Sequence, residues 1–221
     1  MAEEGAREGR LTFRPPSEPV SKHARTGRFE VGGAAVYVPP VDDDEPLRLV
    51  VMLHGAGGAA GSALGLLRSR ADRHGLLLVA PASTGRTWDV IRGDFGPDVR
   101  TLDRVLAEVT AEHPVDGCTI GGFSDGATYA LSLGLTNGDV FDSVVAFSPG
   151  YQASRVQHGR PRVFVSHGTG DQVLRIDRCS RRLVPALQRA GYDVRYHEFE
   201  GEHTVPAAVR RAAVDWLAEP E

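Results

Sequence analysis

The sequence predicts an α/β protein in which helices cover both faces of a mostly parallel central sheet. Short apolar runs alternate along the chain with longer segments of helical spacing, as in chains built from β-α-β units. Several runs are apolar throughout, which is typical of strands buried on both faces. The chain has 221 residues, 41% of them hydrophobic, which suffices for one core, so we expect a single domain over residues 1–221.

The N-terminal part is expected to be the least regular. Residues 1–10 are polar and charged, and we expect them to be flexible. Residues 11–14 and 28–38 contain short strand-like runs separated by Pro and Gly, which predict early strands joined by turns. Residues 39–46, PPVDDDEP, are expected to form a solvated acidic loop, because their carboxylates lack further metal ligands at a useful spacing.

The first buried parallel strand is predicted at residues 48–53, RLVVML, and leads through HGAGG at residues 54–58 into a helix over residues 59–74. A glycine-rich loop in this position can bind a dinucleotide, and residues 55–60 fit the relaxed pattern G-x-G-x-x-A. That function also needs an acidic residue at the end of the next strand, residues 76–80, where the sequence has PASTG instead. The pattern therefore favours another role for these glycines.

In a hydrolase, an H-G-x-G type of loop between a strand and a helix supplies a backbone N–H to the oxyanion hole. Ala56 is the candidate donor in this chain, and we expect Gly57 beside it to contact substrate. His54 comes too early in the chain to be the catalytic base of such a hydrolase, so we expect a structural role for it.

The segment after the next strand offers a wall for a substrate pocket. Residues 83–96, STGRTWDVIRGDFG, leave the carboxyl end of a strand, where open α/β sheets bind ligands, and they include Trp88. The alternative is a surface turn with one packed tryptophan. Residues 97–113 begin with Pro97, are followed by Pro114 and have helical spacing, which predicts a helix that faces the core.

The most informative stretch is DGCTIGGFSDGATYALSLGL, residues 116–135. It predicts a strand, a sharp turn and a helix, and the turn fits G-x-S-x-G with Ser124 at its centre. The flanking residues of such a tight turn must lack bulky side chains, and the turn holds the serine hydroxyl out at the carboxyl edge of the sheet. Because the following helix directs its first amides to the same place, the N–H of Asp125 is the second candidate oxyanion donor.

An acidic candidate follows the strand predicted at residues 162–166. There, SHGTGDQV places Asp171 in a loop, in the order Ser, Asp, His that hydrolases with a G-x-S-x-G turn use. Its carboxylate would orient the histidine and stabilise the imidazolium; the alternative is a local cap of the helix predicted over residues 175–190. We expect Val173 to contact substrate and His167 to make local contacts.

The basic candidate is His203. Of the eight histidines, it alone lies in a glycine-containing loop after the final predicted strand, residues 194–199, and before a terminal helix over residues 206–217. Earlier in the chain, only residues 151–160 connect two predicted strands, which is too short for a large lid. We therefore expect an active site that no lid covers, with Tyr151 at its border.

Four motifs in this order, HGAGG, GGFSDG, SHGTGDQV and FEGEHTVP, resemble those of the α/β-hydrolase fold, and within it the phospholipase/carboxylesterase and dienelactone-hydrolase-like serine esterases. The early segments TFRP and AAVYVP are similar to those of polyhydroxybutyrate-depolymerase and feruloyl-esterase relatives. The resemblance covers roughly residues 28–218 and implies an α/β-hydrolase fold without a large lid. It also implies a catalytic triad and two oxyanion donors, namely Ser124, Asp171 and His203, with Ala56 and Asp125.

The resemblance implies a serine hydrolase that cleaves carboxylic esters through an acyl-enzyme intermediate and needs no metal or organic cofactor. The chain departs from two relatives: Asp125 stands where acyl-protein-thioesterase-like enzymes carry Gln, and Ser124 stands where dienelactone hydrolases proper use Cys. A thioesterase and a polyester or feruloyl-type esterase therefore remain alternatives. A non-catalytic ligand-binding protein of the same fold is the alternative of another class.

The resemblance implies a small-molecule ester as the partner, and composition argues against other kinds of partner. A net charge of -4 argues against nucleic acid or an anionic membrane as the main partner, and no apolar run approaches the length of a membrane span. The charged start lacks the apolar core of a signal peptide, and two cysteines suit a reducing compartment, so we expect a cytoplasmic protein. Arg86, Arg92 and Arg175 lie near the predicted mouth, where they could favour an acidic substrate; solvation at the surface is the simpler interpretation.

Overall fold

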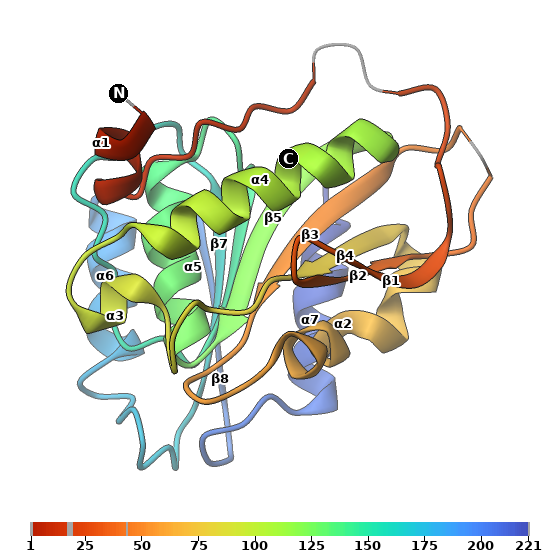
Figure 1. Ribbon diagram of the computed structural model, residues 1–221. Helices are drawn as coiled ribbons and strands as arrows, with labels where there is room; N and C mark the ends of the chain where they lie inside the picture. The colour runs from red at the N-terminus through yellow and green to blue at the C-terminus, as the bar shows by residue number, and fades with distance from the viewer. Residues whose placement is uncertain (1, 17–19, 43, 221) are drawn as a thin grey trace.

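The computed structural model describes residues 2–16, 20–42 and 44–220. They form one eight-stranded sheet with helices around it (Figure 1). The strands lie in the order β1-β2-β4-β3-β5-β6-β7-β8. Their bounds are β1 Gly27–Val31, β2 Ala34–Val38, β3 Leu47–Leu53, β4 Leu76–Ala80, β5 Val115–Phe123, β6 Ser143–Phe147, β7 Arg162–Gly168 and β8 Val194–Phe199. The helices are α1 Ala2–Arg7, α2 Ala60–His74, α3 Asp89–Arg92, α4 Pro97–Glu112, α5 Asp125–Thr136, α6 Ser180–Arg189 and α7 Ala207–Leu217.

The sheet is parallel from β4 through β3, β5, β6 and β7 to β8, whereas the β1–β2 and β2–β4 pairs are antiparallel. The pairing of β3 with β5 continues to Leu53 opposite Gly122, so these two central strands end side by side. Every residue of β4 and of β6 is buried, as expected for strands covered on both faces. The predicted mostly parallel sheet is confirmed.

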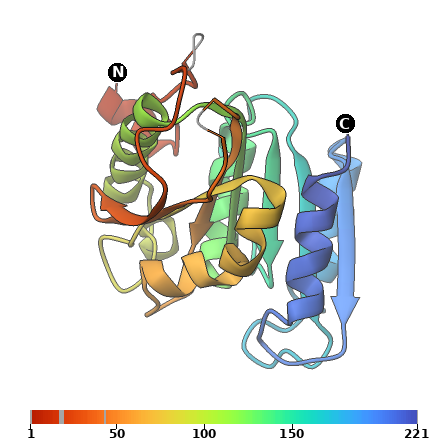
Figure 2. The ribbon, with the colours of Figure 1, turned by 90° about the vertical axis from the view of Figure 1, so that its right-hand side faces the viewer.

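Helices cover both faces of the sheet, as predicted (Figure 2). On one face, α4 and α5 pack on a core that includes Leu102 and Leu131. On the other face, α2 and α7 pack on a second core that includes Leu67 and Val214. Residues 148–161, between β6 and β7, form an irregular connection without a helix, so no large lid is inserted there.

The N-terminal segment is more ordered than its sequence predicts. We expected residues 1–10 to be flexible, whereas Ala2–Arg7 form a helix in which Ala6 is buried; Met1 lies outside the described residues. Arg10 donates a hydrogen bond of 2.9 Å to Oδ1 of Asn137, which is 127 residues away in the chain, and forms an ion pair with Asp139. Long-range partners therefore hold a segment whose own composition is polar.

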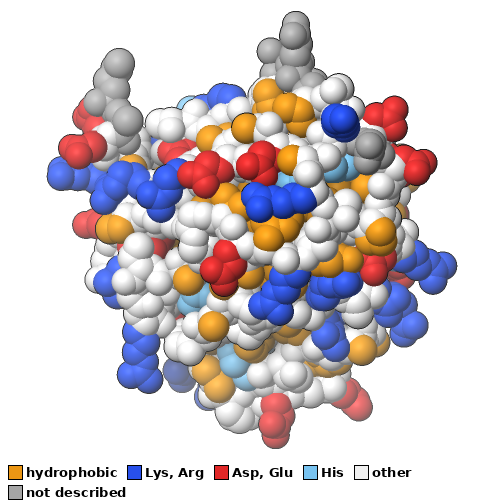
Figure 3. Space-filling view, turned by 45° about the vertical axis from the view of Figure 1, so that its right-hand side comes forward, with side chains coloured by type: hydrophobic (Ala, Val, Ile, Leu, Met, Phe, Trp, Pro, Cys, Tyr) orange, Lys and Arg blue, Asp and Glu red, His pale blue; other side chains and the backbone are white. Residues whose placement is uncertain are grey.

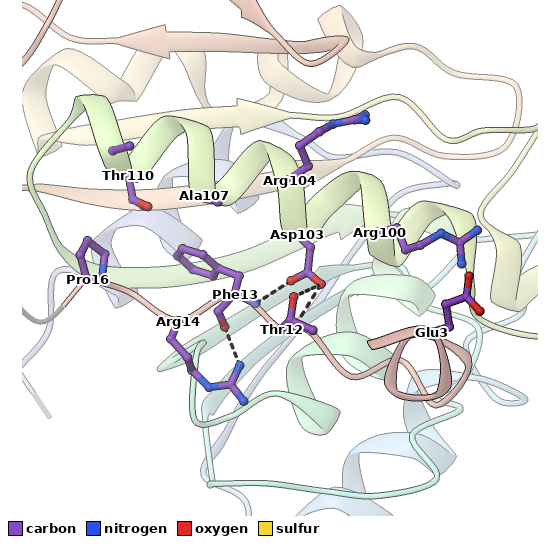
Figure 4. A pocket seen from close by; sticks show the side chains of 11 residues that line it. Glu3, Thr12, Phe13, Arg14, Pro16, Arg100, Asp103, Arg104, Ala107 and Thr110 are labelled. Atoms are coloured by element: carbon purple, nitrogen blue, oxygen red, sulfur yellow. Dashed lines mark hydrogen bonds between the residues drawn. The ribbon is translucent and has the colours of Figure 1, made fainter. Parts of the chain in front are cut away.

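The strand predicted at residues 11–14 does not form. The segment instead lies along α4, and the N–H groups of Thr12 and Phe13 donate to the Asp103 carboxylate at 3.0 and 2.8 Å (Figure 4). A side chain of a helix thus takes the place of a neighbouring strand. A cavity of about 670 Å³ lies between this segment and α4. In the predicted acidic loop that precedes β3, Asp43 lies outside the described residues.

The helix predicted over residues 175–190 is shorter, because α6 begins only at Ser180. Before it, the N–H groups of Arg178 and Cys179 donate to the carbonyl oxygen of Arg175 at 2.8 and 3.1 Å, which forms tight turns. None of the helices in the described part of the chain combines the length and the apolar character that a membrane crossing needs.

Candidate active site

Ser124 lies on the turn between β5 and α5, with backbone angles of φ 59° and ψ -122° that a non-glycine residue rarely adopts. Such a conformation costs roughly 1–3 kcal/mol. A Cβ on Gly122 would lie 2.4 Å from the carbonyl carbon of Gly126, and a Cβ on Gly126 would lie 2.3 Å from the carbonyl oxygen of Leu53. Only glycine therefore fits on either side, and the tight turn presents the serine at the carboxyl ends of β3 and β5.

The structure brings His203 and Asp171 to the Ser124 hydroxyl. His203 Nε2 lies 2.8 Å from Ser124 Oγ, and His203 Nδ1 lies 2.5 Å from Asp171 Oδ2. Nδ1–H donates to the carboxylate, which leaves Nε2 free to accept the hydroxyl proton. The Phe123 ring packs against the imidazole with a centroid distance of 4.7 Å and restricts its motion. These contacts join residues 79 and 32 positions apart in the chain.

The Asp171 carboxylate is oriented by its own loop. Its side chain is fully buried, and Oδ1 accepts hydrogen bonds from the N–H groups of Val173 at 2.9 Å and Leu174 at 2.8 Å. The local Asx-turn that the sequence offers as an alternative role is therefore present. It leaves Oδ2 for His203, so the turn and the histidine contact use different oxygens of one carboxylate.

His167 supports this loop from β7. Its Nε2–H donates to the carbonyl oxygen of Leu174 at 2.7 Å and lies 3.3 Å from Asp171 Oδ2, while Nδ1 accepts from the Ser180 hydroxyl at 2.7 Å. Burial lowers the pKa of His167, so the imidazole is neutral at pH 7. The sequence predicts its local contacts but not its nearness to the carboxylate. The spacing of four residues to Asp171, after a buried strand, is the signal that could have indicated it.

The predicted oxyanion donors lie on the two segments that meet at Ser124. The N–H groups of Ala56 and Asp125 donate to no acceptor in the described part of the chain. The carbonyl oxygen of Gly55 accepts from His54 Nδ1 at 2.8 Å and from the N–H of Gly58 at 2.9 Å. Because C=O and N–H point in opposite directions in a trans peptide, this directs the Ala56 N–H away from the His54 ring.

His54 has the structural role that its place in the chain predicts. Its Nε2 accepts a hydrogen bond of 3.1 Å from the N–H of Ser83, which fixes the proton on Nδ1. The ring thus links the glycine-rich loop to the segment that follows β4. Nearby, the Thr87 hydroxyl donates to the Asp125 carboxylate at 2.6 Å, which ties the same segment to the start of α5.

Two of the expected substrate contacts face other parts of the protein. Trp88 is only 2% exposed; its Nε1–H donates to the carbonyl oxygen of His54 at 2.8 Å, and its ring stacks on Tyr129 at 5.1 Å. It therefore packs behind the glycine-rich loop, which agrees with the alternative of a packed tryptophan and not with a pocket wall. The Gly57 N–H donates to the carbonyl oxygen of Arg86 at 2.8 Å and is not available to a substrate.

Tyr151 and Val173, the other expected contacts, are exposed beside the triad. Their exposed fractions are 46% and 69%, which is high for large apolar side chains. Val173 follows Asp171 by two residues, and Tyr151 lies close enough to Asp125 for its charge to raise the tyrosine pKa, after the larger effect of burial. Both side chains are available to an apolar part of a substrate.

Two buried carboxylates that the sequence does not single out hold the segment between β4 and α4. Asp98 accepts from the N–H groups of Thr84 at 2.6 Å and Asp89 at 2.8 Å, and Asp89 accepts from those of Gly96 at 2.8 Å and Asp98 at 2.9 Å. Burial raises the pKa of Asp89. Within residues 2–16, 20–42 and 44–220, no group of three or more His, Cys, Asp or Glu side chains is placed to hold a metal ion.

Comparison with known proteins agrees with this geometry. Residues 101–207, which include Ser124, Asp171 and His203, match a family described as putative esterase. The structure resembles that of the esterase PE8, with 25% identity, a TM-score of 0.66, and coverage of 81% of this chain and 95% of that chain. Both comparisons support the predicted family of α/β-hydrolase esterases. The predicted family is thereby confirmed, and the protein is a carboxylic ester hydrolase.

Other structures share the fold of this esterase at lower identity. A phospholipase/carboxylesterase from Dyadobacter fermentans is 20% identical with a TM-score of 0.65, and the match covers 91% of this chain and 100% of that chain. The Bacillus cereus carboxylesterase is also 20% identical, with a TM-score of 0.64 and coverage of 83% and 92%. A search of curated protein sequences finds no match to the esterase.

Proposed function

We propose that the esterase cleaves carboxylic esters by a Ser-His-Asp mechanism with an acyl-enzyme intermediate. The observation that carries the proposal is the continuous set of contacts from Ser124 Oγ through His203 to Asp171, at 2.8 and 2.5 Å. Both contacts are short enough for a general base to take a proton from a nucleophile and for an acid to orient that base.

In the proposed reaction, Ser124 Oγ attacks the ester carbonyl while His203 Nε2 takes the hydroxyl proton. The imidazolium then returns a proton to the leaving alcohol, and water resolves the acyl-enzyme by the same route. Asp171 keeps the proton on Nδ1 and stabilises the imidazolium, without accepting the proton itself. Its full burial strengthens that electrostatic contribution, because little water screens it.

The tetrahedral intermediate needs donors for its negative oxygen. We assign this role to the N–H groups of Ala56 and Asp125, which have no acceptor among the described residues and lie on the segments that meet at Ser124. Loss of one such donor costs roughly 3–4 kcal/mol of transition-state stabilisation in related chemistry. The Asp125 amide is also at the N-terminus of α5, where the helix dipole favours negative charge.

The test is Ser124→Ala, assayed with p-nitrophenyl butyrate and labelled with a fluorophosphonate. We expect kcat to fall on the order of 10⁶-fold and labelling to disappear, as for other triads. Ser69→Ala, at an exposed serine of α2, is the matched control and should keep both signals. Turnover at the wild-type rate in Ser124→Ala would contradict the assignment. A wild-type protein that neither labels nor turns over would favour the non-catalytic binding protein instead.

Ester and thioester substrates remain to be separated within the proposed mechanism. A series of p-nitrophenyl esters and matched acyl thioesters of increasing chain length measures both the leaving-group preference and the depth of the acyl site. Because the connection between β6 and β7, residues 148–161, contains no helical lid, we expect activity to change gradually with acyl-chain length. A sharp optimum for long chains would contradict an open site.

A further inference from the structure

A small cavity lies beside the proposed triad, between the connection that follows β6 and the start of α6. Its volume is about 250 Å³, and its walls include Gly150, Tyr151, Gln152, Arg178, Cys179 and Arg182. The N–H of Gly150 donates to the hydroxyl of Thr128 at 2.9 Å, and Thr128 lies one helical turn after Ser124. The cavity therefore begins about one turn of α5 from the nucleophile.

Both walls of this cavity are within electrostatic reach of the active site. On one wall, Tyr151 has a pKa raised first by burial and then by the charge of Asp125. On the other wall, Cys179 has a pKa raised first by burial and then by the charge of Asp171. The charges of Asp125 and Asp171 thus act on the cavity walls, although neither side chain lines the cavity.

The charged side chains of the cavity are both positive. Arg178 and Arg182 are exposed and form no ion pair with the described residues. The two guanidinium groups are four residues apart and repel each other, because no carboxylate between them offsets their charge. The nearby carboxylates of Asp177 and Glu198 do not neutralise them, because both bind Arg181 at 2.7 Å.

The all-positive lining of this cavity contrasts with the net charge of the chain and with the mixed charges on another face. The chain has a net charge of -4, and basic and acidic side chains are interspersed on the face shown in Figure 3. The larger cavity beside α4 also contains arginines, but Asp103 and Glu3 accompany them there. A small all-positive cavity next to a nucleophile suits a negatively charged group that arrives with the substrate.

Neutral donors accompany the two guanidinium groups. The Tyr151 hydroxyl has no hydrogen-bond partner among the described residues. The Gln152 Oε1 accepts from the N–H of Ser154 at 2.8 Å, which leaves the Gln152 amide nitrogen with two hydrogens to donate. Guanidinium groups bind carboxylates through paired N–H···O hydrogen bonds, so the wall offers donors and no competing acid.

We propose that this cavity is a subsite for an anionic group of the substrate, and that the esterase prefers esters whose acyl part ends in a carboxylate. The proposal rests on the proposed function, because it assumes that Ser124 is the nucleophile. Arg178 and Arg182 bind the carboxylate, while Tyr151 and Gln152 donate to its remaining lone pairs. The subsite fixes the position of the ester carbonyl relative to Ser124.

The test compares mono(p-nitrophenyl) succinate with p-nitrophenyl butyrate, which differ by a terminal carboxylate on the same four-carbon acyl chain. The measured quantity is the ratio of kcat/KM for the anionic ester to that for the neutral ester. In Arg178→Gln/Arg182→Gln we expect this ratio to fall roughly ten- to hundredfold, mainly through KM for the succinate. The wild-type ratio should also fall when NaCl is raised, because salt screens an exposed ion pair.

The matched control is Arg189→Gln/Arg211→Gln, which removes the same charge at exposed arginines of α6 and α7 outside the cavity. It should keep the wild-type ratio. An equal ratio in the two double variants overturns the subsite but leaves the proposed function intact, provided that butyrate hydrolysis still depends on Ser124. Absence of turnover of both esters by the wild type would count against the nucleophile and, with it, the subsite.

Discussion

Histidines lie at both ends of β5, a buried pair before the strand and the half-buried His203 after it, and only His203 contacts both a carboxylate and a hydroxyl. Before the strand, His113 Nδ1 lies 3.1 Å from His23 Nδ1, and His23 Nε2 lies 2.9 Å from the carbonyl oxygen of Glu45. After the strand, His203 lies between a carboxylate and the hydroxyl of Ser124. The same type of side chain, an imidazole, therefore has different partners at the two ends.

The partners decide what each imidazole can do. His23 Nε2–H donates to a carbonyl, so its Nδ1 accepts from His113, and His113 Nε2 is left buried without a partner. In residues 2–16, 20–42 and 44–220, no carboxylate is hydrogen-bonded to that pair to stabilise an imidazolium. At the other end, Asp171 supplies the charge and Ser124 supplies a proton to take. We therefore expect His203 to be catalytic, because it has both an acid and a nucleophile, and we expect no catalytic role for the His23–His113 pair.

The largest expected effect on this comparison comes from Asp171→Asn. The amide keeps the shape but favours the wrong tautomer of His203, so we expect kcat for p-nitrophenyl butyrate to fall about 10⁴-fold. Fluorophosphonate labelling should slow in parallel. The control is Asp177→Asn, an exposed acid of the same segment outside the triad. A loss in Asp171→Asn no larger than in this control would remove the distinction between the two ends of β5.

A smaller effect is expected from His167, which acts through the loop of the acid. His167→Ala removes the hydrogen bond to Leu174 and leaves Asp171 free to shift, so we expect a roughly 10- to 100-fold fall in kcat with little change in KM. His167→Gln restores an N–H donor and should recover part of the rate. The matched variant at the other end, His113→Gln, should change stability without changing kcat. Equal kcat values in His167→Ala, His167→Gln and His113→Gln would contradict a positioning role for His167.

The smallest effect is on stability, and it concerns the amino end of β5. Burial, followed by the charge of His23, lowers the pKa of His113 to about 4, whereas the unfolded chain titrates near 6.5. The folded state therefore binds fewer protons, and this stability is complete above pH 6.5 and decreases as the pH falls toward 4. Glu112 and Arg25 nearby have opposing influences.

Urea unfolding measures this contribution at pH 7.5 and pH 5. One proton of difference corresponds to about 1.4 kcal/mol per pH unit, so His113 should account for roughly 2 kcal/mol of the loss. In His113→Phe this part of the pH dependence should be absent. If the variant and the wild type lose equal stability between the two pH values, the buried imidazole is not the cause.

The glycine-rich turns made much of the fold predictable. The steric demand at Gly122 is local, because a Cβ there would meet the backbone of Gly126, and the alternation of apolar strands with helices predicts right-handed crossovers in a parallel sheet. Conversely, the strand predicted at residues 11–14 does not form. Its apolar alternation does not reveal that Asp103, on a helix far away in the chain, supplies the hydrogen-bond acceptors. Trp88 shows the same limit, since its burial depends on Tyr129 and the carbonyl oxygen of His54.

The sequence alone determined the fold class and the candidates at positions 124, 171 and 203, because short stretches of chain set the backbone sterics and the strand order. The resemblance of its motifs also indicated the esterase family. Only the tertiary structure decided that their side chains meet, that His167 stands behind the acid, and that Arg178 and Arg182 share a cavity without a carboxylate. Each of these facts concerns residues that belong to different elements of the fold. They depend on how whole elements pack, which no local pattern encodes.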